Sequence, residues 1–354
     1  MAQVTQAQIA AELNISRSTV AAVLSRQPTA QISKELSKKI LVTAKRMGYR
    51  PNRYAQTIRK GTSGLIGVIN FGGLQQMPIQ KLIHSVEAIT RGGFEPFVQD
   101  VFWFTELDDS ACEKMISLRV EGVLLMHPHL QFIQKYLDAL LNADIPVVSM
   151  GGEHLQGIPR FMSDKEGGFY TLTKHLISLG HKTLTLLLGK ESPSSWHSAK
   201  SQLGFERAIH EHKGVKGQVE FSTYSSSLET KPLSPYQPGY EAMKKLLQKP
   251  QLPQAVLCSN DNWALGALTA CGEAEIQVPQ QLAITGFENE PFAEAGLLPL
   301  TTVAHPVKEI AHNAANLLID LIRRKTMPQS SITIIPGSLI VRRSCGSYLK
   351  KHAR

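Results

Sequence analysis

Residues 5–24 read TQAQIAAELNISRSTVAAVL, and this stretch predicts two short helices joined by a tight turn. Thr5 and Gln8 have the spacing of a capping box, in which two side chains satisfy backbone amides at a helix start. Ser16 is a favourable N-cap for the second helix. Apolar residues at spacings of three and four give that helix one buried face, namely Val20, Val23 and Leu24. This arrangement is a helix-turn-helix.

A third helix is predicted after the motif. Ser33 is its expected N-cap, and Gly48 ends it because glycine tolerates the left-handed conformation found just past many helix ends. The inward-facing positions are apolar: Leu36, Ile40, Ala44 and Met47. Helices this short form a core only together, so residues 1–50 are expected to make one all-α domain.

The basic residues of the chain are concentrated around this motif. The net charge is +9, and residues 1–61 hold eleven Lys and Arg against two acidic residues, whereas the rest of the chain is neutral. A neutral body with a basic head is typical of a module that binds a polyanion. Charge alone does not separate DNA from RNA or a membrane surface.

The start of the second helix is the part that such motifs present to the major groove. Arg17 and Ser18 are therefore expected to contact base edges, since arginine can bond both acceptors of a guanine. The hydroxyls of Ser16 and Thr19 lie near the helix start, where they suit phosphate. Further backbone contacts are expected from three basic side chains, Lys34, Lys38 and Arg53.

These residues resemble the LacI/GalR family of bacterial repressors, most specifically in Asn14-Ile15-Ser16, Thr19-Val20 and the run Gly48-Tyr49-Arg50-Pro51-Asn52-Arg53. In that family the Pro-Asn-x-x-Ala run forms a hinge helix that folds on operator DNA and wedges an apolar side chain into the minor groove. By match, Ile58 is the wedge; the alternative is a plain linker. The resulting set of DNA-binding residues is Thr5, Ser16, Arg17, Ser18, Thr19, Ala22, Ser33, Asn52, Arg53, Ala55 and Ile58.

The motif departs from the family pattern at two places. Ala21 and Ala22 stand where the family usually has Ser-Arg, so one customary arginine contact is missing. The loop 25–31 is also longer than usual by about two residues. These departures leave the operator sequence open.

From residue 62 onward, short β-rich runs alternate with amphipathic helical stretches, which predicts parallel sheets covered by helices. The predicted strands are 65–71, 97–102, 122–126, 146–150, 183–188, 219–222, 255–259 and 282–287. The predicted helices include 79–91, 106–118, 130–142, 167–179, 198–212, 238–248, 262–273 and 306–323.

The family resemblance continues here, for example in Ser259-Asn260-Asp261 and Pro299-Leu300-Thr301-Thr302. It implies a periplasmic-binding-protein-like α/β domain of two Rossmann-like lobes with an effector in the cleft between them. The expected organisation is a helix-turn-helix domain at 1–50, a hinge or linker at 51–61, an effector-binding and dimerisation domain at 62–345, and a tail at 346–354. Lobe 1 is expected at about 62–162 and 292–328, and lobe 2 at about 163–291 and 329–345.

Ligands of open α/β sheets bind beyond the carboxyl ends of the strands. This rule, together with the family match, indicates a set of effector-binding candidates: Phe71, His127, Asp164, Trp196, Ser201, Asn260, Asp261 and Glu288. Carboxylates and amides suit hydroxyl groups, so a sugar or a related metabolite such as a nucleoside is expected. Ser201 stands where the family often has an arginine, and Gly151-Gly152 replace a common Asp-Arg pair, which disfavours an anionic ligand.

Other function classes lack their motifs. The four cysteines have no C-x-x-C spacing, and the chain has no nucleophile elbow, H-E-x-x-H pair or P-loop, so neither catalysis nor a metal or other cofactor is expected. No apolar run reaches membrane-spanning length and no secretory signal is apparent, which favours a cytoplasmic protein over a transport receptor.

The predicted function is that of a sequence-specific DNA-binding transcriptional regulator, most simply a repressor, controlled by a small-molecule effector. Palindromic operators are read by two-fold-related subunits, so a homodimer is expected. The tail 345–354 has no heptad repeat that would support a tetramer. The sequence does not indicate whether the effector releases DNA or promotes its binding.

Overall fold

The computed structural model describes residues 4–24, 32–50, 62–71, 76–100, 110–128, 130–152, 155–189, 196–222, 234–327, 329 and 331–349. The chain forms two compact units, Met1–Ser63 and Gly64–Arg354. The predicted hinge 51–61, with Asn52, Arg53, Ala55 and Ile58, lies outside the described residues, and so does the loop 25–31.

The first unit contains the three predicted helices, α1 (Gln6–Leu13), α2 (Arg17–Leu24) and α3 (Lys34–Arg46). Both halves of the Thr5–Gln8 capping box are present, and the Ser33 hydroxyl accepts a hydrogen bond from the Leu36 amide, so both predicted caps are confirmed. The shared core consists of Ile9, Ala10, Val20, Ile40 and Ala44. Helices of 8 to 13 residues are marginal alone, so this core holds the unit together.

The second unit contains two parallel sheets. The larger has the order β11-β5-β4-β3-β1-β2. Its strands are β1 (Leu65–Asn70), β2 (Glu95–Asp100), β3 (Gly122–Met126), β4 (Val147–Met150), β5 (Arg160–Ser163) and β11 (Ile332–Ile335). Every pairing in it is parallel, as the alternation of strands and helices predicts.

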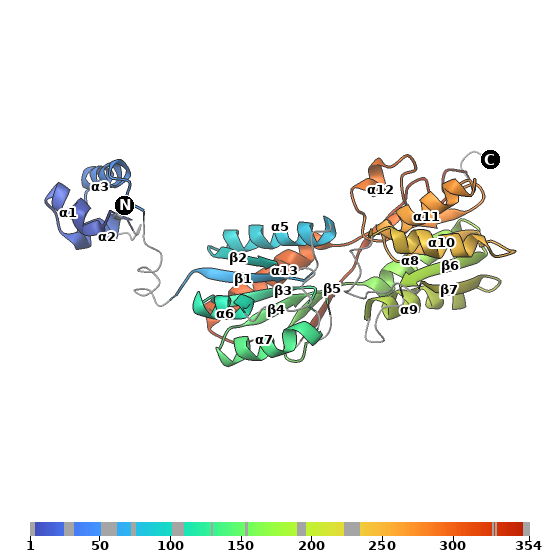
Figure 1. The fold of residues 1–354 in the computed structure, drawn as a ribbon, viewed down its shortest axis with the longest axis horizontal. Coiled ribbons are helices and arrows are strands. Elements are labelled where there is room, and N and C mark those ends of the chain that lie inside the picture. The colour runs from blue at the N-terminus through green and yellow to red at the C-terminus, as the bar shows by residue number, and fades with distance from the viewer. Residues whose placement is uncertain are drawn as a thin grey trace. The chain divides into compact units, whose positions relative to one another are not determined.

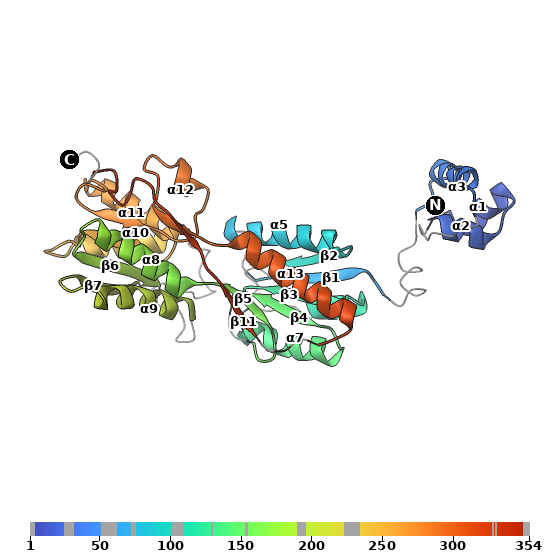
Figure 2. The ribbon, with the colours of Figure 1, turned by 180° about the vertical axis from the view of Figure 1, so that it is seen from behind.

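Helices cover both faces of this sheet. One face, with Val68 and Leu124, packs against α5 (Gln76–Arg91) and α13 (Val307–Arg324). The other face, with Ile69 and Leu125, packs against α6 (Ser110–Ser117) and α7 (Leu130–Asn142). Neighbouring residues of a strand point to opposite faces, so the central strands β1, β3, β4 and β5 are buried on both, whereas the edge strands β2 and β11 are more exposed. Figures 1 and 2 show α5 and α13 lying side by side on their face.

The smaller sheet has the order β7-β6-β8-β9. Its strands are β6 (Thr183–Gly189), β7 (Lys216–Ser222), β8 (Ala255–Cys258) and β9 (Ala283–Thr285). On one face lie α8 (Lys165–Ser178) and α9 (Trp196–His210), and on the other lie α10 (Gln237–Leu247) and α11 (Asp261–Glu273). We refer to the larger sheet with its helices as lobe 1 and the smaller as lobe 2.

The expected lobe boundaries after residue 291 are wrong in two segments. Residues of 292–300, including the short helix α12 (Phe292–Ala295), pack in the lobe 2 core through Ala293 and Leu300, although 292–328 was expected in lobe 1. Strand β11 pairs with β5 in lobe 1, although 329–345 was expected in lobe 2. The chain thus crosses after β10 (Thr302–Ala304) and again between β11 and β12 (Ser338–Ile340). Strand β12 pairs with β10 in antiparallel orientation. None of the strands β10, β11 and β12 was among the strands predicted from the sequence.

Candidate DNA-binding surface and interlobe site

The start of α2 presents a compact group of polar side chains. Ser16, Arg17 and Ser18 are exposed, and Thr19 is half-buried. The Ser16 Oγ accepts a hydrogen bond from the Thr19 amide at 3.1 Å and lies 2.7 Å from the Ser18 Oγ and 2.8 Å from the Thr19 Oγ1. Three hydroxyls therefore meet at the positive end of a helix, where a phosphate is stabilised by the aligned backbone dipoles. Arg17 is the one cation among them.

The other described DNA-binding candidates of the head have structural roles as well. Thr5 and Ser33 are exposed but act as helix caps, and Ala22 is half-buried on α2. On the helical surface, Arg46 pairs with Glu12, with 2.7 Å between Nη2 and Oε1. This pair links α3 to α1. The positive charge of Arg46 is thereby neutralised by Glu12, in contrast to that of Arg17.

In the second unit, ionisable side chains from both lobes meet where the strands end. We call this group the interlobe cluster; it consists of Lys81, His127, Lys165, Glu288 and Glu290. Lys81 lies on α5 and is 1% exposed, with its Nζ 3.1 Å from Nε2 of His127 at the end of β3. Lys165 opens α8 and places its Nζ 3.9 Å from the Glu288 Oε1 and 4.0 Å from the centre of the Phe287 ring.

Two interactions link the lobes at this cluster. Glu288 of lobe 2 interacts electrostatically with Lys81 of lobe 1, and the Glu290 carboxylate accepts a hydrogen bond from the backbone of Met77 on α5. Glu290 is only 4% exposed. A ligand that competes for these groups would act on both lobes at once.

The cluster holds its charges in an unfavourable environment. Burial lowers the pKa of Lys81 to about 7, while the Glu288 carboxylate opposes that shift. Burial also raises the pKa of Glu290 to about 7, with a further increase from Glu288. The pKa of Glu288 itself is raised by burial, against the influence of Lys165 and Lys81. Perturbed groups that gather in one place are characteristic of functional sites.

Two further features mark the cluster as more than a structural ion pair. Lys165 is a cation in the first turn of α8, where the helix dipole is unfavourable for positive charge. Glu288 and Asn289 have positive φ angles of 108° and 57°, a conformation that costs about 1–3 kcal/mol for residues other than glycine. Arg342 secures this turn by donating from Nη2 to the Asn289 Oδ1 at 2.8 Å. Strain of this kind persists where the surrounding fold enforces it.

Of the predicted effector-binding residues, His127 and Glu288 belong to the cluster, and the others have different positions. Asp164 caps α8 by accepting from the Gly167 amide at 2.8 Å, and Asn260 caps α11 by accepting from the Trp263 amide at 2.9 Å. Phe71 packs against the lobe 1 core, Ser201 is buried on α9, and the Trp196 side chain lies outside the described residues.

Asp261, another predicted effector-binding residue, uses both of its carboxylate oxygens within the protein. It is fully buried, and its two carboxylate oxygens accept from the Glu290 amide and the Thr302 hydroxyl, each at 2.7 Å. Burial raises its pKa to about 7, while these two hydrogen bonds counteract the shift. Asp261 thus supports the Glu288–Glu290 turn, and its predicted part in effector binding stays a prediction.

Sequence reasoning missed Lys81, Lys165 and Glu290. Lys81 had a detectable signal, since it stands four residues before Ser85 and eight before Ile89 on the buried stripe of α5, where an apolar residue is expected. Lys165 comes directly after the predicted residue Asp164, and Glu290 lies two residues after the predicted residue Glu288. No local pattern indicates that residues so far apart in the chain meet.

A surface cavity elsewhere in lobe 2 is a weaker candidate. It lies between β7 and α10 and is lined by Glu220, Phe221, Ser222, Glu241, Ala242, Lys245 and Leu246. Its Glu220 is paired with Lys249. The lining of this cavity comes from lobe 2 alone, whereas buried charges from both lobes converge at the interlobe cluster. Among the helices that the structure describes, none is long and apolar enough to cross a membrane.

Comparison with known proteins places this geometry in context. Residues 173–345 match the periplasmic binding protein-like domain. The chain is 30% identical to the HTH-type transcriptional repressor PurR of Pasteurella multocida over 346 residues, which cover 96% of this chain and 98% of that protein. It is 26% identical to catabolite control protein A of Priestia megaterium over 343 residues, 96% of this chain and 99% of that protein.

Solved structures share the fold over almost the full length. The lac repressor dimer bound to operator and the anti-inducer ONPF matches with a TM-score of 0.79 at 21% identity, covering 97% of this chain and 99% of that chain. The complex of the transcriptional regulator CelR with cellobiose matches with a TM-score of 0.65 at 21% identity, covering 97% and 100%. Both the helical head and the two-lobed body therefore have counterparts in the same order along one chain.

Proposed function

The chain belongs to the LacI/GalR family of bacterial transcriptional regulators, and on that premise we propose that it is a cytoplasmic homodimeric repressor of a palindromic operator, controlled by a small-molecule effector at the interlobe cluster. In this proposal residues 1–50 read the DNA, residues 51–61 form the hinge, and residues 62–345 bind the effector and the second subunit. The lac repressor of similar fold is a dimer bound to operator, which supports this assembly.

The exposed start of α2 carries the DNA-binding part of the proposal. Arg17 is positioned to reach a base edge, while the hydroxyls of Ser16, Ser18 and Thr19 surround the helix start and suit a phosphate. Ala22, where family members commonly have arginine, contributes no charge. Base recognition by α2 therefore depends on Arg17 more heavily than the family pattern implies.

The interlobe cluster supports a sugar or nucleoside as the effector. Sugar hydroxyls both donate and accept hydrogen bonds, and the cluster offers carboxylates as acceptors beside an ammonium and an imidazole. The cellobiose complex of a regulator with this fold agrees with that class. A ligand with different affinity for two lobe arrangements shifts the balance between them, and that shift would be the signal transmitted to the head.

Selection of bound operators from random duplexes tests the regulatory function. We expect a palindromic consensus, together with a steep decrease of affinity with salt because phosphate contacts release counterions. A purified dimer that selects no sequence and shows no salt dependence would refute the repressor assignment.

A thermal-shift screen of sugars and nucleosides tests the effector site. A ligand that stabilises the chain should lose most of its effect in Glu288→Gln and keep it in the control Glu309→Gln, whose side chain is exposed on α13. Repeating the operator measurement with that ligand shows whether it releases DNA or promotes binding. A ligand whose effect is equal in both variants would remove Glu288 from the site.

A further inference from the structure

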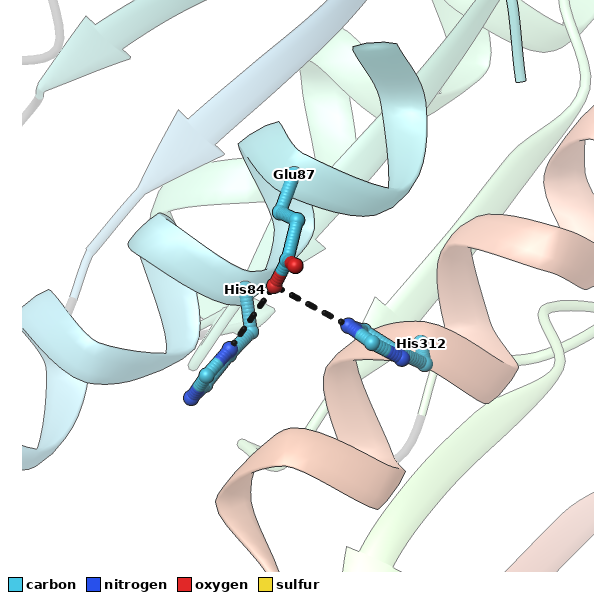
Figure 3. A group of neighbouring side chains, drawn as sticks. All are labelled: His84, Glu87 and His312. Atoms are coloured by element: carbon cyan, nitrogen blue, oxygen red, sulfur yellow. Dashed lines mark hydrogen bonds and ion pairs between the residues drawn. The ribbon is translucent and has the colours of Figure 1, made fainter. Parts of the chain in front are cut away.

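Two histidines and a glutamate from separate helices meet on lobe 1. His84 and Glu87 lie one turn apart on α5, and His312 faces them from α13 (Figure 3). The Glu87 Oε2 lies 3.3 Å from Nδ1 of His84 and 3.5 Å from Nε2 of His312. The three candidate ligand atoms all lie within 4.8 Å of one another.

The Glu87 Oε2 lies from each histidine nitrogen at a distance that suits two ligands of one metal ion. A charge-assisted N–H···O bond is about 2.7–2.9 Å long, and both contacts to Glu87 exceed that. Ligands bonded to a tetrahedral ion at about 2.0–2.1 Å lie about 3.3–3.4 Å apart. Among the described residues, His312 is one of few whose buried ring nitrogen, Nε2, has no hydrogen-bond partner.

The group lies near the protein surface. The side chains of His84, Glu87 and His312 are 29%, 35% and 22% exposed, although the Nε2 atom of His312 is itself buried. Arg91 contacts the other carboxylate oxygen, Oε1, at 2.5 Å, which leaves Oε2 directed at the histidines.

We propose that His84, Glu87 and His312 form a binding site for a divalent transition-metal ion of the Zn²⁺ class, which fastens α5 to α13. Imidazole and carboxylate are ligands that such ions accept, and three protein ligands leave a fourth position for water. The half-exposed side chains can adjust to bring the two imidazole nitrogens to ligand spacing. The sequence suggested no metal site, because His312 lies far along the chain from the His-x-x-Glu pair on α5.

Titration of the full-length chain with Co²⁺ tests this site, after removal of metal by a chelator that is then dialysed away. We expect one equivalent to produce visible d–d absorption that Zn²⁺ abolishes by displacement. His312→Gln and His84→Gln should each weaken binding by at least about tenfold. The matched control is His210→Gln, an exposed histidine on α9, and it should bind as the unaltered chain does.

Thermal unfolding provides the second readout. Zn²⁺ should raise the unfolding midpoint of the unaltered chain and of His210→Gln, but not that of His312→Gln, because a ligand that binds only the folded state stabilises it. Equal midpoints of the metal-free proteins show that the variants are folded. Absence of Co²⁺ absorption in the unaltered chain, or undiminished affinity in both His84→Gln and His312→Gln, would overturn the proposal.

Discussion

The Nζ of Lys81 on α5 lies 3.1 Å from Nε2 of His127, which follows β3, and the two groups form the lobe 1 side of the interlobe cluster. A hydrogen bond at this distance requires one nitrogen to accept, so the two groups are not both fully protonated. Because Lys81 is buried, the stability of the folded protein depends on whether its amine is protonated.

Lys81→Met should change how stability depends on pH. Burial lowers the Lys81 pKa from 10.5 to about 7, so between these values the unfolded chain binds a proton that the folded protein has released. Stability from this group therefore rises with pH across that window. We expect the unfolding free energy of the unaltered chain, relative to Lys81→Met, to increase by about 2 kcal/mol between pH 6.5 and 8.5.

Denaturant titrations at the two pH values measure this effect. Lys308→Met, on the exposed side of α13, is the control. Its unfolding free energy should differ from that of the unaltered chain by the same amount at both pH values. If the effect of Lys81→Met on the unfolding free energy is the same at both pH values, Lys81 keeps an ordinary pKa in the folded protein.

Arg17→Ala should lower affinity for the selected operator by about 1–3 kcal/mol, because it removes the base-reading cation of α2. Affinity for random DNA should fall less. Arg46→Ala removes the same charge from α3, where it is already paired with Glu12, and should leave the ratio of specific to random binding unchanged. Equal losses on both DNAs for Arg17→Ala would assign it to phosphate contact instead. Fluorescence anisotropy with both duplexes measures this.

Replacing Gly266 and replacing Gly272 on α11 with alanine should have opposite effects on the stability of the protein. A Cβ at Gly266 would collide with the backbone oxygen of Tyr236 and the backbone nitrogen of Tyr240, whereas one at Gly272 would meet nothing within 4 Å. Gly266→Ala should destabilise by about 1–3 kcal/mol through overpacking of α10 against α11. Gly272→Ala should stabilise by about 0.5–1 kcal/mol through helix propensity. Urea unfolding measures both changes. A Gly266→Ala variant as stable as the unaltered chain would contradict the close packing.

Thr302→Val should weaken the support behind the interlobe cluster. The Thr302 hydroxyl donates to the Asp261 Oδ1 at 2.7 Å, and its loss leaves a buried carboxylate oxygen without that donor. We expect a loss of about 1–3 kcal/mol in unfolding free energy. Thr269→Val on α11 removes only a surface hydrogen bond to the Leu265 carbonyl and should change stability by less than about 0.5 kcal/mol. Similar losses in both variants would argue against the role of Asp261.

Local sequence was sufficient wherever short-range chemistry decides the structure. The Thr5–Gln8 capping box, the Ser33 cap and the apolar spacing of α1–α3 depend on residues three or four apart, and the structure confirms each. The same holds for the buried strands of both sheets, whose apolar runs are legible without tertiary information. Their parallel pairing followed from the intervening helices.

Tertiary structure alone decided which polar residues meet. Strands β10, β11 and β12 were not predicted from the sequence, so the positions where the chain returns between lobes were wrong. Lys81, Lys165 and Glu290 come from three distant segments, and their shifted pKa values arise from burial that exists only in the folded chain. The sequence by itself thus determined the helix-turn-helix, the basic head and the α/β body, because these rest on local periodicity and composition. The interlobe cluster and the His84–Glu87–His312 group required the fold, because nothing local brings their members together.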